Sequence, residues 1–451
     1  MQQNFNVMIV LKFGGTSVGN AQNIRKVAEI IASCPQPKIV VLSAVAGTTN
    51  TLVSINESIG LFQLESTIAK INTLEDSYNQ LVKELYNTEQ YYNLATDFIK
   101  RQFSHLRSLS GNMLNEKEIL AQGELISTNL FQIYQDEQHQ NSRLINALDY
   151  MSIDAFGEPD MESIQSRLAE AIKNSGATNT YITQGYICRN HLGEIDNLKR
   201  GGSDYSASLI GAAVEADEIQ IWTDIDGMHN NDPRYVNHTF SIEEMSFDEA
   251  AELAYFGAKI LHPQSIIPAQ KNNIPVLLKN TFNPSDKGTL IRNGSIPTGV
   301  RAIAAKDGIT AIKIKSYRML MAYGFLKKIF EIFEKYQTAI DMITTSEVAV
   351  SLTIDNTKHL EKILAELEPF GKIASDTNMS IICLAGDFDQ DAKGISSRVI
   401  NCLQDIPLRM ISYGGSNYNM SLLIAAEDKI RALNLLNEGL FVQNKQYQSL
   451  I

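Results

Sequence analysis

The end of the first apolar run carries a cation, bare backbone and hydroxyls, a combination that suits a phosphate. The segment VMIVLKFGGTSVGN reaches Lys12 at the close of that run and continues through Gly14, Gly15 and Ser17. Adjacent glycines let the backbone approach a ligand closely, and amides at a turn that leads into a helix attract an anion. The alternative is that the glycines only make a tight turn and Lys12 only ends a strand.

A second glycine pair stands in LKRGGSDYSASLIGAA, where Arg200 precedes Gly201 and Gly202, and Ser203 and Asp204 follow. The planar guanidinium of an arginine suits a carboxylate or a phosphate. The aspartate is well placed to begin a helix, and capping alone would explain it. Two turns that each combine a cation with a glycine pair favour an anion site.

Two later segments add polar residues that could bind a nucleotide. In IWTDIDGMHNNDPR, a predicted strand ends in Thr223 and Asp224, and Arg234 follows a run of turn residues. Ligands of α/β proteins lie at the carboxyl ends of strands, although a polar surface loop is the alternative. Lys259 in AYFGAKILHP would add a second charge near a triphosphate, or would extend its ammonium to solvent.

The elements that must position these residues are those of a parallel sheet. The apolar run 7–11 predicts a strand, the segment 20–33 has isoleucine and valine at helical spacing, and 38–43 predicts a second buried strand. A strand, helix and strand in this order form a βαβ unit with its ligand edge at the carboxyl ends. Residues 61–140 are mostly helical in pattern, and further strands are expected in NTYITQGYI, DEIQIWTDI and IPVLLKN.

The pattern changes after PTGVRAIAAKDG. From residue 309 onward, the chain reads strand, helix, two strands, helix and strand, and then nearly repeats this order. Two small α+β units of similar order predict a tandem repeat appended to a larger domain. We therefore expect a catalytic domain in residues 1–300 and the repeat in residues 301–451.

Composition excludes several classes of protein. A chain of 451 residues is expected to form two or more domains. A net charge of −12 argues against nucleic acid as a partner, because that binding needs clustered Lys and Arg, but a local basic cleft can still bind an anion. The 4 cysteines have no CxxC pair, so neither a zinc site nor a disulfide framework is expected. No signal peptide or membrane span is predicted, which favours the cytoplasm.

Taken together, the motifs resemble a known family. KFGGTSV, SAVAGTTN, QGE, ITQGYI, RGGSD, WTDIDG and FGAKILHP resemble the aspartate kinases (aspartokinases), in that family's order along the chain. ITTSEVAVSLTID and RMISYGGSNYNMSLLIAAED resemble that family's paired ACT regulatory domains. The resemblance implies an α/β amino-acid-kinase fold, with a mostly parallel sheet flanked by helices, and two C-terminal ferredoxin-like ACT domains. It also implies transfer of the γ-phosphoryl group of ATP to the β-carboxylate of L-aspartate, the first step toward lysine, threonine and methionine.

The resemblance also implies roles for individual residues. Lys12 would stabilise the transferred phosphoryl group, and Asp204 would organise this lysine. The residues expected to bind ATP are Lys12, Gly14, Gly15, Ser17, Thr223, Asp224, His229, Arg234 and Lys259. Those expected to bind aspartate are Ser43, Thr49, Glu124, Arg200, Gly201, Gly202 and Ser203. No direct protein ligand is expected for Mg²⁺, which ATP phosphates would hold. His229 and Lys199 depart from the family, where tyrosine and glycine are common.

Regulation by lysine or threonine is a further implication. In lysine-inhibited relatives the effector lies between ACT domains of two subunits, so a homodimer or tetramer is expected. The residues that agree with this pattern are Met319, Gly324, Phe325, Asp341 and Glu347, whereas Met321 and Ala322 replace polar residues.

The chemistry agrees with the implied reaction, because the β-carboxylate of aspartate has a pKa of about 3.9 and needs no general base. The obstacle is repulsion between two anions, which cations, amide dipoles and Mg²⁺ must offset. One alternative is an amino-acid kinase that acts on glutamate or N-acetylglutamate. Another is an effector-binding regulator whose kinase site has decayed, which the presence of Lys12, Arg200 and Asp204 disfavours. A fusion to homoserine dehydrogenase is not expected, because nothing follows the ACT repeat.

Overall fold

A computed structural model of the chain forms two compact units, each described here by itself. The first contains residues 1–228, 243–247 and 261–294, and the second contains 229–242, 248–260 and 295–451. Two segments that precede residue 300 thus group with the C-terminal part of the chain. The structure describes all residues except 1–6, 111–114, 199–200, 257–260, 295–297, 317–318, 320–322, 389–392 and 443–451.

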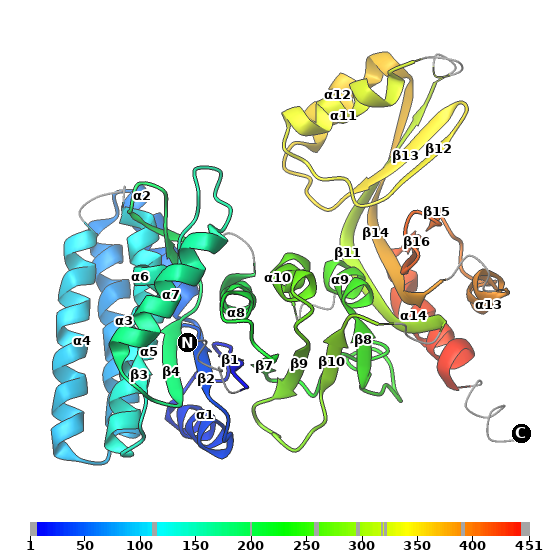
Figure 1. Cartoon of the computed structure of the whole chain (residues 1–451). Helices are drawn as coiled ribbons and strands as arrows, with labels where there is room; N and C mark the ends of the chain where they lie inside the picture. Colours follow the sequence, from blue (N-terminus) through cyan, green and yellow to red (C-terminus); the bar gives the residue numbers. More distant parts are fainter. Residues whose placement is uncertain are drawn as a thin grey trace, which may run out of the picture. The chain divides into compact units, whose positions relative to one another are not determined.

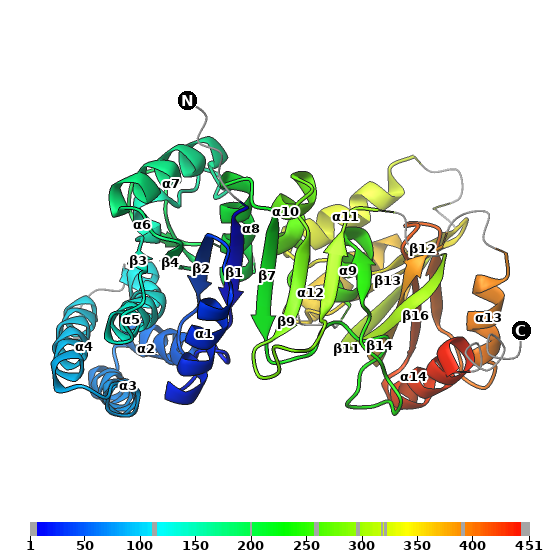
Figure 2. The ribbon, with the colours of Figure 1, turned by 60° about the horizontal axis from the view of Figure 1, so that its bottom comes forward.

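The first unit is built on an eight-stranded sheet in the order β3-β4-β2-β1-β7-β9-β10-β8. Its strands from β3 to β9 pair in parallel, and β10 is antiparallel to β9. Figure 2 shows β2, β1, β7 and β9 side by side. The bounds are β1 Ile9–Phe13, β2 Lys38–Leu42, β3 Arg143–Leu144, β4 Thr180–Gln184, β7 Glu218–Thr223, β8 Glu244–Ser246, β9 Val276–Asn280 and β10 Thr289–Arg292. The predicted mostly parallel sheet is confirmed.

The first βαβ unit forms as its sequence predicts. Helix α1 spans Ala21–Ser33, and the Asn20 side chain caps it by accepting a hydrogen bond from the amide of Asn23. Its buried face carries Ile24, Val27, Ile30 and Ile31. Strand β1 continues through Lys12 and Phe13, beyond the apolar run, so the lysine lies inside the sheet rather than after it.

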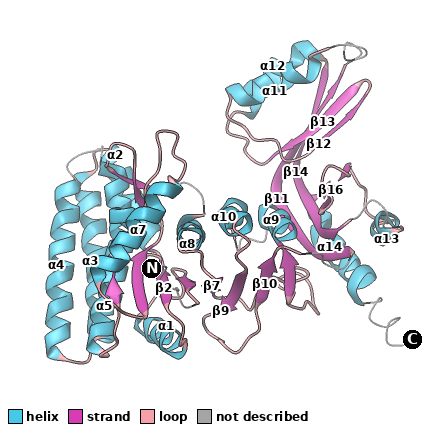
Figure 3. Ribbon diagram, in the orientation of Figure 1, coloured by secondary structure: helices cyan, strands magenta, loops and turns pink. Residues whose placement is uncertain are grey.

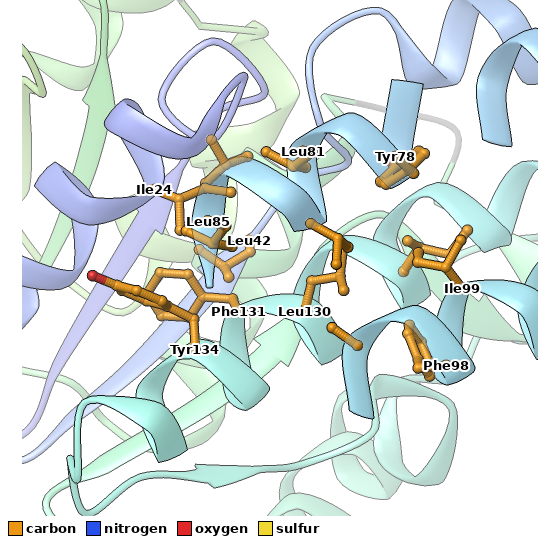
Figure 4. Close-up of a cluster of buried hydrophobic side chains, with 14 of the residues drawn as sticks. Ile24, Leu42, Tyr78, Leu81, Leu85, Phe98, Ile99, Leu130, Phe131 and Tyr134 are labelled. Atoms are coloured by element: carbon orange, nitrogen blue, oxygen red, sulfur yellow. The ribbon is translucent and has the colours of Figure 1, made fainter. Parts of the chain in front are cut away.

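Helices cover one face of the sheet in a thick layer, formed by α2 Thr48–Gly60, α3 Leu64–Leu85, α4 Glu89–Leu109 and α5 Glu116–Glu137. Figure 1 shows α3, α4 and α5 side by side. Their shared core is drawn in Figure 4, which labels Ile24, Leu42, Tyr78, Leu81, Leu85, Phe98, Ile99, Leu130, Phe131 and Tyr134. Among the described residues, no helix has both the length and the apolar composition that a bilayer span needs.

The remaining elements of the first unit include α8, the helix that follows the second glycine pair. Alternation along β1 directs Leu11 and Phe13 into the core under α2–α5 and Lys12 to the other face. Helix α8, Gly202–Ala213, contacts the sheet from that face through the pairing of Asp204 with Lys12. The other bounds are α6 Ala147–Tyr150, α7 Met161–Ser175, β5 Ile187–Arg189, β6 Ile195–Asn197 and α10 Ile267–Lys271.

The second unit contains a six-stranded antiparallel sheet in the order β12-β13-β11-β14-β16-β15. Two long strands, β11 and β14, run through its middle, and Figure 3 shows α11 and α12 beside one half of the sheet and α13 and α14 beside the other. The bounds are α9 Phe247–Tyr255, β11 Gly299–Lys315, α11 Phe325–Lys335, β12 Ile343–Ser346, β13 Ala349–Ile354, α12 Leu360–Leu367, β14 Lys372–Asp387, α13 Ile395–Cys402, β15 Met410–Tyr413, β16 Asn419–Ala425 and α14 Lys429–Asn437.

Strand β11 contributes to both halves of this sheet. Ile312 and Ile314, late in β11, pack in one core with α11, α12 and β13. Ile303, early in the same strand, packs in the other core with α13, β16 and α14. The register between β11 and β14 shifts after Lys306. The expected tandem repeat is therefore present, but residues before Ile309 complete its second half.

Candidate active site

The ammonium of Lys12 and the carboxylate of Asp204 form an ion pair beside the carboxyl end of β1. Lys12 Nζ lies 2.6 Å from Asp204 Oδ1, and the two side chains are only 11% and 15% exposed. A Cβ at Gly14 would lie 3.5 Å from the same ammonium, so this glycine leaves the nitrogen open on that side. The predicted pair of Lys12 and Asp204 is thus brought together by β1 and α8.

Gly15 allows the turns that follow β1 and β2 to lie close together. A Cβ at this position would lie 3.0 Å from the carbonyl oxygen of Ala44, so a side chain would push the loops apart. The amide of Ser43 donates to the carbonyl of Phe13 (3.2 Å). The hydroxyl of Ser43 donates to Ser203 Oγ (2.9 Å), which joins the end of β2 to the first turn of α8.

The second glycine pair begins α8 in a conformation that favours glycine. Gly201 and Gly202 have φ values of +62° and +50°, in the left-handed region. A Cβ at Gly201 would also lie 2.6 Å from the Cβ of Ser265. The helix therefore starts close to Lys12, with its positive dipole end at the site. Arg200 and Lys199 lie outside the described residues.

Glu124 is a buried carboxyl group at the same place. Its side chain comes from α5, is 3% exposed as a residue, and accepts a hydrogen bond through Oε1 from the amide of Ala44 (3.3 Å). Within the described part of the chain, Oε2 has no hydrogen-bond partner. Burial is the main cause that raises the pKa of Glu124 to about 8. Thr49, in the first turn of α2, is half-buried and follows Ala44 by five positions along the chain.

Ser17 is placed differently from the two glycines. It is fully buried, with its Oγ 2.7 Å from Thr281 Oγ1. The hydroxyl thus fastens the turn after β1 to the residue after β9, and its expected role toward a phosphate stays a prediction. At the end of β7, the Thr223 hydroxyl donates to the exposed carboxylate of Asp224 (3.0 Å).

The other residues expected at the nucleotide belong to the second unit or are not described. The Arg234 guanidinium donates three hydrogen bonds to the Asp232 carboxylate (3.0, 3.2 and 2.7 Å), and its side chain is 74% exposed. His229 pairs with Ser241 in an isolated β-bridge, and its Nδ1 lies 3.3 Å from Thr239 Oγ1. Lys259 lies outside the described residues. Their nucleotide contacts stay predictions.

Tyr186 is a neighbour of the site that the sequence did not single out. It has a φ of +66°, which is rare for a bulky residue. Its amide donates to Ser206 Oγ (2.8 Å). At the preceding Gly185, a Cβ would lie 2.3 Å from Ser203 Oγ. Burial, with a smaller effect of the Glu124 charge, raises the pKa of Tyr186 to about 12. In the sequence, the glycine of ITQGYI directly before this bulky residue was the feature that could have indicated a tight turn here.

Asp341 is the most completely buried acid among the residues expected to bind an effector, and its side chain is 1% exposed. Its Oδ1 lies 2.7 Å from Lys306 Nζ and accepts a hydrogen bond from the Tyr255 hydroxyl (3.0 Å). Lys306 also lies 2.9 Å from Asp355 Oδ2. Of the other expected residues, Met319 is partly exposed, Gly324 has a left-handed backbone conformation and Phe325 is buried. Glu347 is exposed in a β-turn. Met321 and Ala322 lie outside the described residues.

The described residues do not form a metal site of their own. Over the ranges that the structure describes, no three His, Cys, Asp or Glu side chains cluster so that they could hold a metal ion. The carboxylate of Asp204, in the first turn of α8, is paired with Lys12.

Comparisons with known proteins find matches to both parts of the chain. Residues 7–280 match the amino acid kinase family, and residues 382–440 match an ACT domain. Lysine-sensitive aspartokinase 3 of Escherichia coli is 32% identical over 96% of this chain and 99% of its own length. The structure of E. coli aspartokinase III with aspartate and ADP (R-state) has a TM-score of 0.83 at 31% identity, covering 96% of this chain and 100% of that one. Its complex with lysine and aspartate (T-state) has a TM-score of 0.81 at 32% identity, covering 96% and 99%.

The match extends over both units, and Lys12, Gly14, Gly15 and Asp204 lie together beside the carboxyl end of β1 in the first unit. This chain belongs to the aspartokinase family of amino acid kinases.

Proposed function

We propose that this protein is an aspartate kinase, which transfers the γ-phosphoryl group of ATP to the β-carboxylate of L-aspartate and releases ADP and 4-phospho-L-aspartate. The observation that carries the proposal is the ion pair of Lys12 and Asp204 between two glycine-bearing turns. The E. coli relative, crystallised with aspartate and ADP, supports this substrate pair.

The reaction needs positioning and charge neutralisation rather than proton transfer. A β-carboxylate oxygen attacks the γ-phosphorus, a new P–O bond forms, and the bond to the β-phosphate oxygen of ADP breaks. The carboxylate is ionised near neutral pH, because its pKa is about 3.9. The protein must therefore hold two anions together and stabilise the charge on the transferred group.

Lys12 performs the central part of this task. Its ammonium is directed to the phosphoryl group, and Asp204 keeps the nitrogen in place through the 2.6 Å ion pair. The backbone at Gly14 and Gly15 and the start of α8 add amide dipoles. The remaining nucleotide contacts would come from Thr223, Asp224, His229, Arg234 and Lys259, with Ser17 supporting the turn. Mg²⁺, held through the ATP phosphates, would supply further neutralisation when bound.

Aspartate would bind beside α5 and α8. Glu124 has a buried oxygen without a hydrogen-bond partner in the described chain, and the substrate ammonium would supply that partner. Arg200 and Ser203 would bind the α-carboxylate at the start of α8. Ser43, Thr49, Gly201 and Gly202 would shape the rest of the subsite. These roles predict that a substrate lacking a free ammonium group binds poorly.

Feedback by lysine is the proposed regulation, with threonine as the alternative effector. The E. coli relative is named lysine-sensitive and was crystallised with lysine. Asp341 is a buried acid whose Oδ2 has no hydrogen-bond partner in the described residues, so it can accept a bond from an ammonium. A homodimer or tetramer through the ACT halves and a cytoplasmic location stay predictions.

Trapping the acyl phosphate with hydroxylamine tests the proposed reaction. The protein should form a hydroxamate from ATP, Mg²⁺ and L-aspartate, and little from glutamate or N-acetylglutamate. A rate with either alternative acid that equals or exceeds the aspartate rate would favour another kinase of the same fold. No ATP-dependent product from any of these acids would indicate a regulator without kinase activity.

A further inference from the structure

The first turn of α2, which carries Thr49, is joined to α3 by a hydrogen bond between two buried hydroxyls. Thr48 Oγ1 lies 2.9 Å from the phenolic oxygen of Tyr78 on α3. Thr48 is 2% exposed and Tyr78 is 1% exposed, so water does not compete for this hydrogen bond. The pair joins residues that are 30 positions apart in the chain.

The start of α2 depends on this contact more than an ordinary helix start would. Its N-cap position is occupied by Gly47, which has a φ of +83° and no side chain that could cap the helix. The amide of Thr48 donates to the carbonyl of Val45 (3.0 Å), and its hydroxyl is bound by Tyr78. The first turn of α2 is therefore fixed by a side chain from another helix rather than by a cap of its own.

The same threonine is packed on its other side against the helix that carries Glu124. A Cβ at Gly123 would lie 3.4 Å from Thr48 Cγ2 and 2.8 Å from the Cβ of Ala44. Ala44 in turn supplies the amide that binds Glu124. Thr48 thus lies between Tyr78 and the backbone of α5, directly before Thr49 and close to Glu124.

We propose that Tyr78 is a positioning residue for the amino-acid substrate, which acts through Thr48 on the first turn of α2, where Thr49 lies, and on the Ala44–Glu124 contact. This inference rests on the proposed function. Tyr78 does not reach the phosphate-binding turn, where the contacts of Gly14, Gly15 and Ser17 are made with other residues. Loss of its hydroxyl should therefore weaken binding of aspartate and leave binding of ATP unchanged.

The electrostatic environment is consistent with this geometry. Burial is the main cause that raises the pKa of the Tyr78 phenol, the Thr48 hydrogen bond opposes it, and the Glu124 charge adds to it. The phenol therefore stays protonated and can donate its hydrogen bond throughout the working range of pH.

Steady-state kinetics of Tyr78→Phe test the inference, with Tyr86→Phe as the matched control. Tyr86 is also buried, and its hydroxyl donates to the Leu130 carbonyl (2.6 Å) in the same helical layer. In Tyr78→Phe, KM for aspartate should rise about three- to tenfold, the range expected when one hydrogen bond is lost, with KM for ATP unchanged. In Tyr86→Phe, both KM values should equal those of the parent, although thermal stability falls.

Thr48→Val gives a second and independent route to the same contact. It should reproduce the rise in KM for aspartate, and the double variant should show no larger rise than either single one, because all three lack the same hydrogen bond. An unchanged KM for aspartate in Tyr78→Phe and Thr48→Val, or an equal rise in Tyr86→Phe, would overturn the inference. A parent protein without aspartate-dependent turnover would instead overturn the proposed function, and the inference with it.

Discussion

Asp204 binds Lys12 from the first turn of α8, and the 2.6 Å ion pair holds the ammonium beside the carboxyl end of β1. Because the carboxylate positions the cation rather than contacting a reactant, Asp204→Asn should lower kcat by about ten- to a hundredfold, with smaller changes in both KM values. Asp217→Asn is the control, since Asp217 binds the amide of Met8 (2.8 Å) at the opposite end of β1. A kcat for Asp204→Asn equal to that of the control would show that the ion pair has only a structural role.

The buried carboxyl of Glu124 predicts a pH dependence of aspartate binding. The pKa of the free group is raised to about 8, mainly by burial, so most molecules carry a neutral Glu124 at pH 7. The substrate ammonium requires the carboxylate, so KM for aspartate should fall by up to about tenfold per pH unit as pH rises toward 8, and then level off. Glu124→Gln should have a high KM that varies little with pH over this range.

Stability gives an independent check on Glu124. A carboxyl whose pKa is higher in the folded than in the unfolded state stabilises the fold most at low pH, and this contribution is lost as pH rises through the folded value. Urea denaturation should therefore show that the stability of Glu124→Gln, measured relative to the parent at the same pH, is greater at pH 8 than at pH 5. The same stability difference at both values would mean that the acid titrates normally.

Ser17 and Thr281 predict a structural rather than a chemical effect. The Ser17 hydroxyl is buried against Thr281 Oγ1, so Ser17→Ala should lower the free energy of unfolding by about 1–2 kcal/mol through the unpaired threonine. Thr281→Val added to Ser17→Ala should recover part of that loss, because both polar partners are then absent. If Ser17→Ala instead raises KM for ATP by more than its lower stability accounts for, a direct contact between Ser17 and a phosphate would be favoured.

From the buried carboxylate of Asp341 we predict the site at which lysine would act. Asp341→Asn should remove most inhibition by lysine and leave the uninhibited rate within about twofold, because Asp341 lies in the second unit and the carboxylate is the only change. Asp376→Asn is the control, since Asp376 pairs with Arg409 (3.1 Å) on a half-exposed surface of the same sheet. Inhibition by lysine that persists in Asp341→Asn would place the effector elsewhere or identify another effector.

Local pattern was sufficient for the elements that form the site. The apolar runs, the helical spacing after Asn20 and the glycine pairs predicted β1, α1, β2 and the start of α8, because each depends on contacts close in sequence. The pairing of Lys12 with Asp204 was reached only through family resemblance. Sequence spacing alone cannot show that residues 192 positions apart are in contact, and here the sheet face sets that contact.

Long-range features were missed for the same physical reason. Residues 299–306 of β11 were not predicted as a strand, but they pair with the far end of β14 and join the core of the second ACT half. The Thr48–Tyr78 contact and the burial of Ser17 against Thr281 also depend on packing between distant segments. Tyr255 was not considered for the Asp341 cluster, because α9 precedes the predicted domain boundary.

Single-turnover phosphoryl transfer in Lys12→Met tests the central claim most directly. Lys38→Met is the matched control, because Lys38 is also buried, on the neighbouring strand, but at its amino end. With ATP, Mg²⁺ and aspartate saturating, Lys12→Met should transfer the phosphoryl group at least about a thousandfold more slowly than the parent, while nucleotide binding stays within about tenfold and Lys38→Met keeps the parent's transfer rate. A transfer rate for Lys12→Met close to that of the parent would contradict the account.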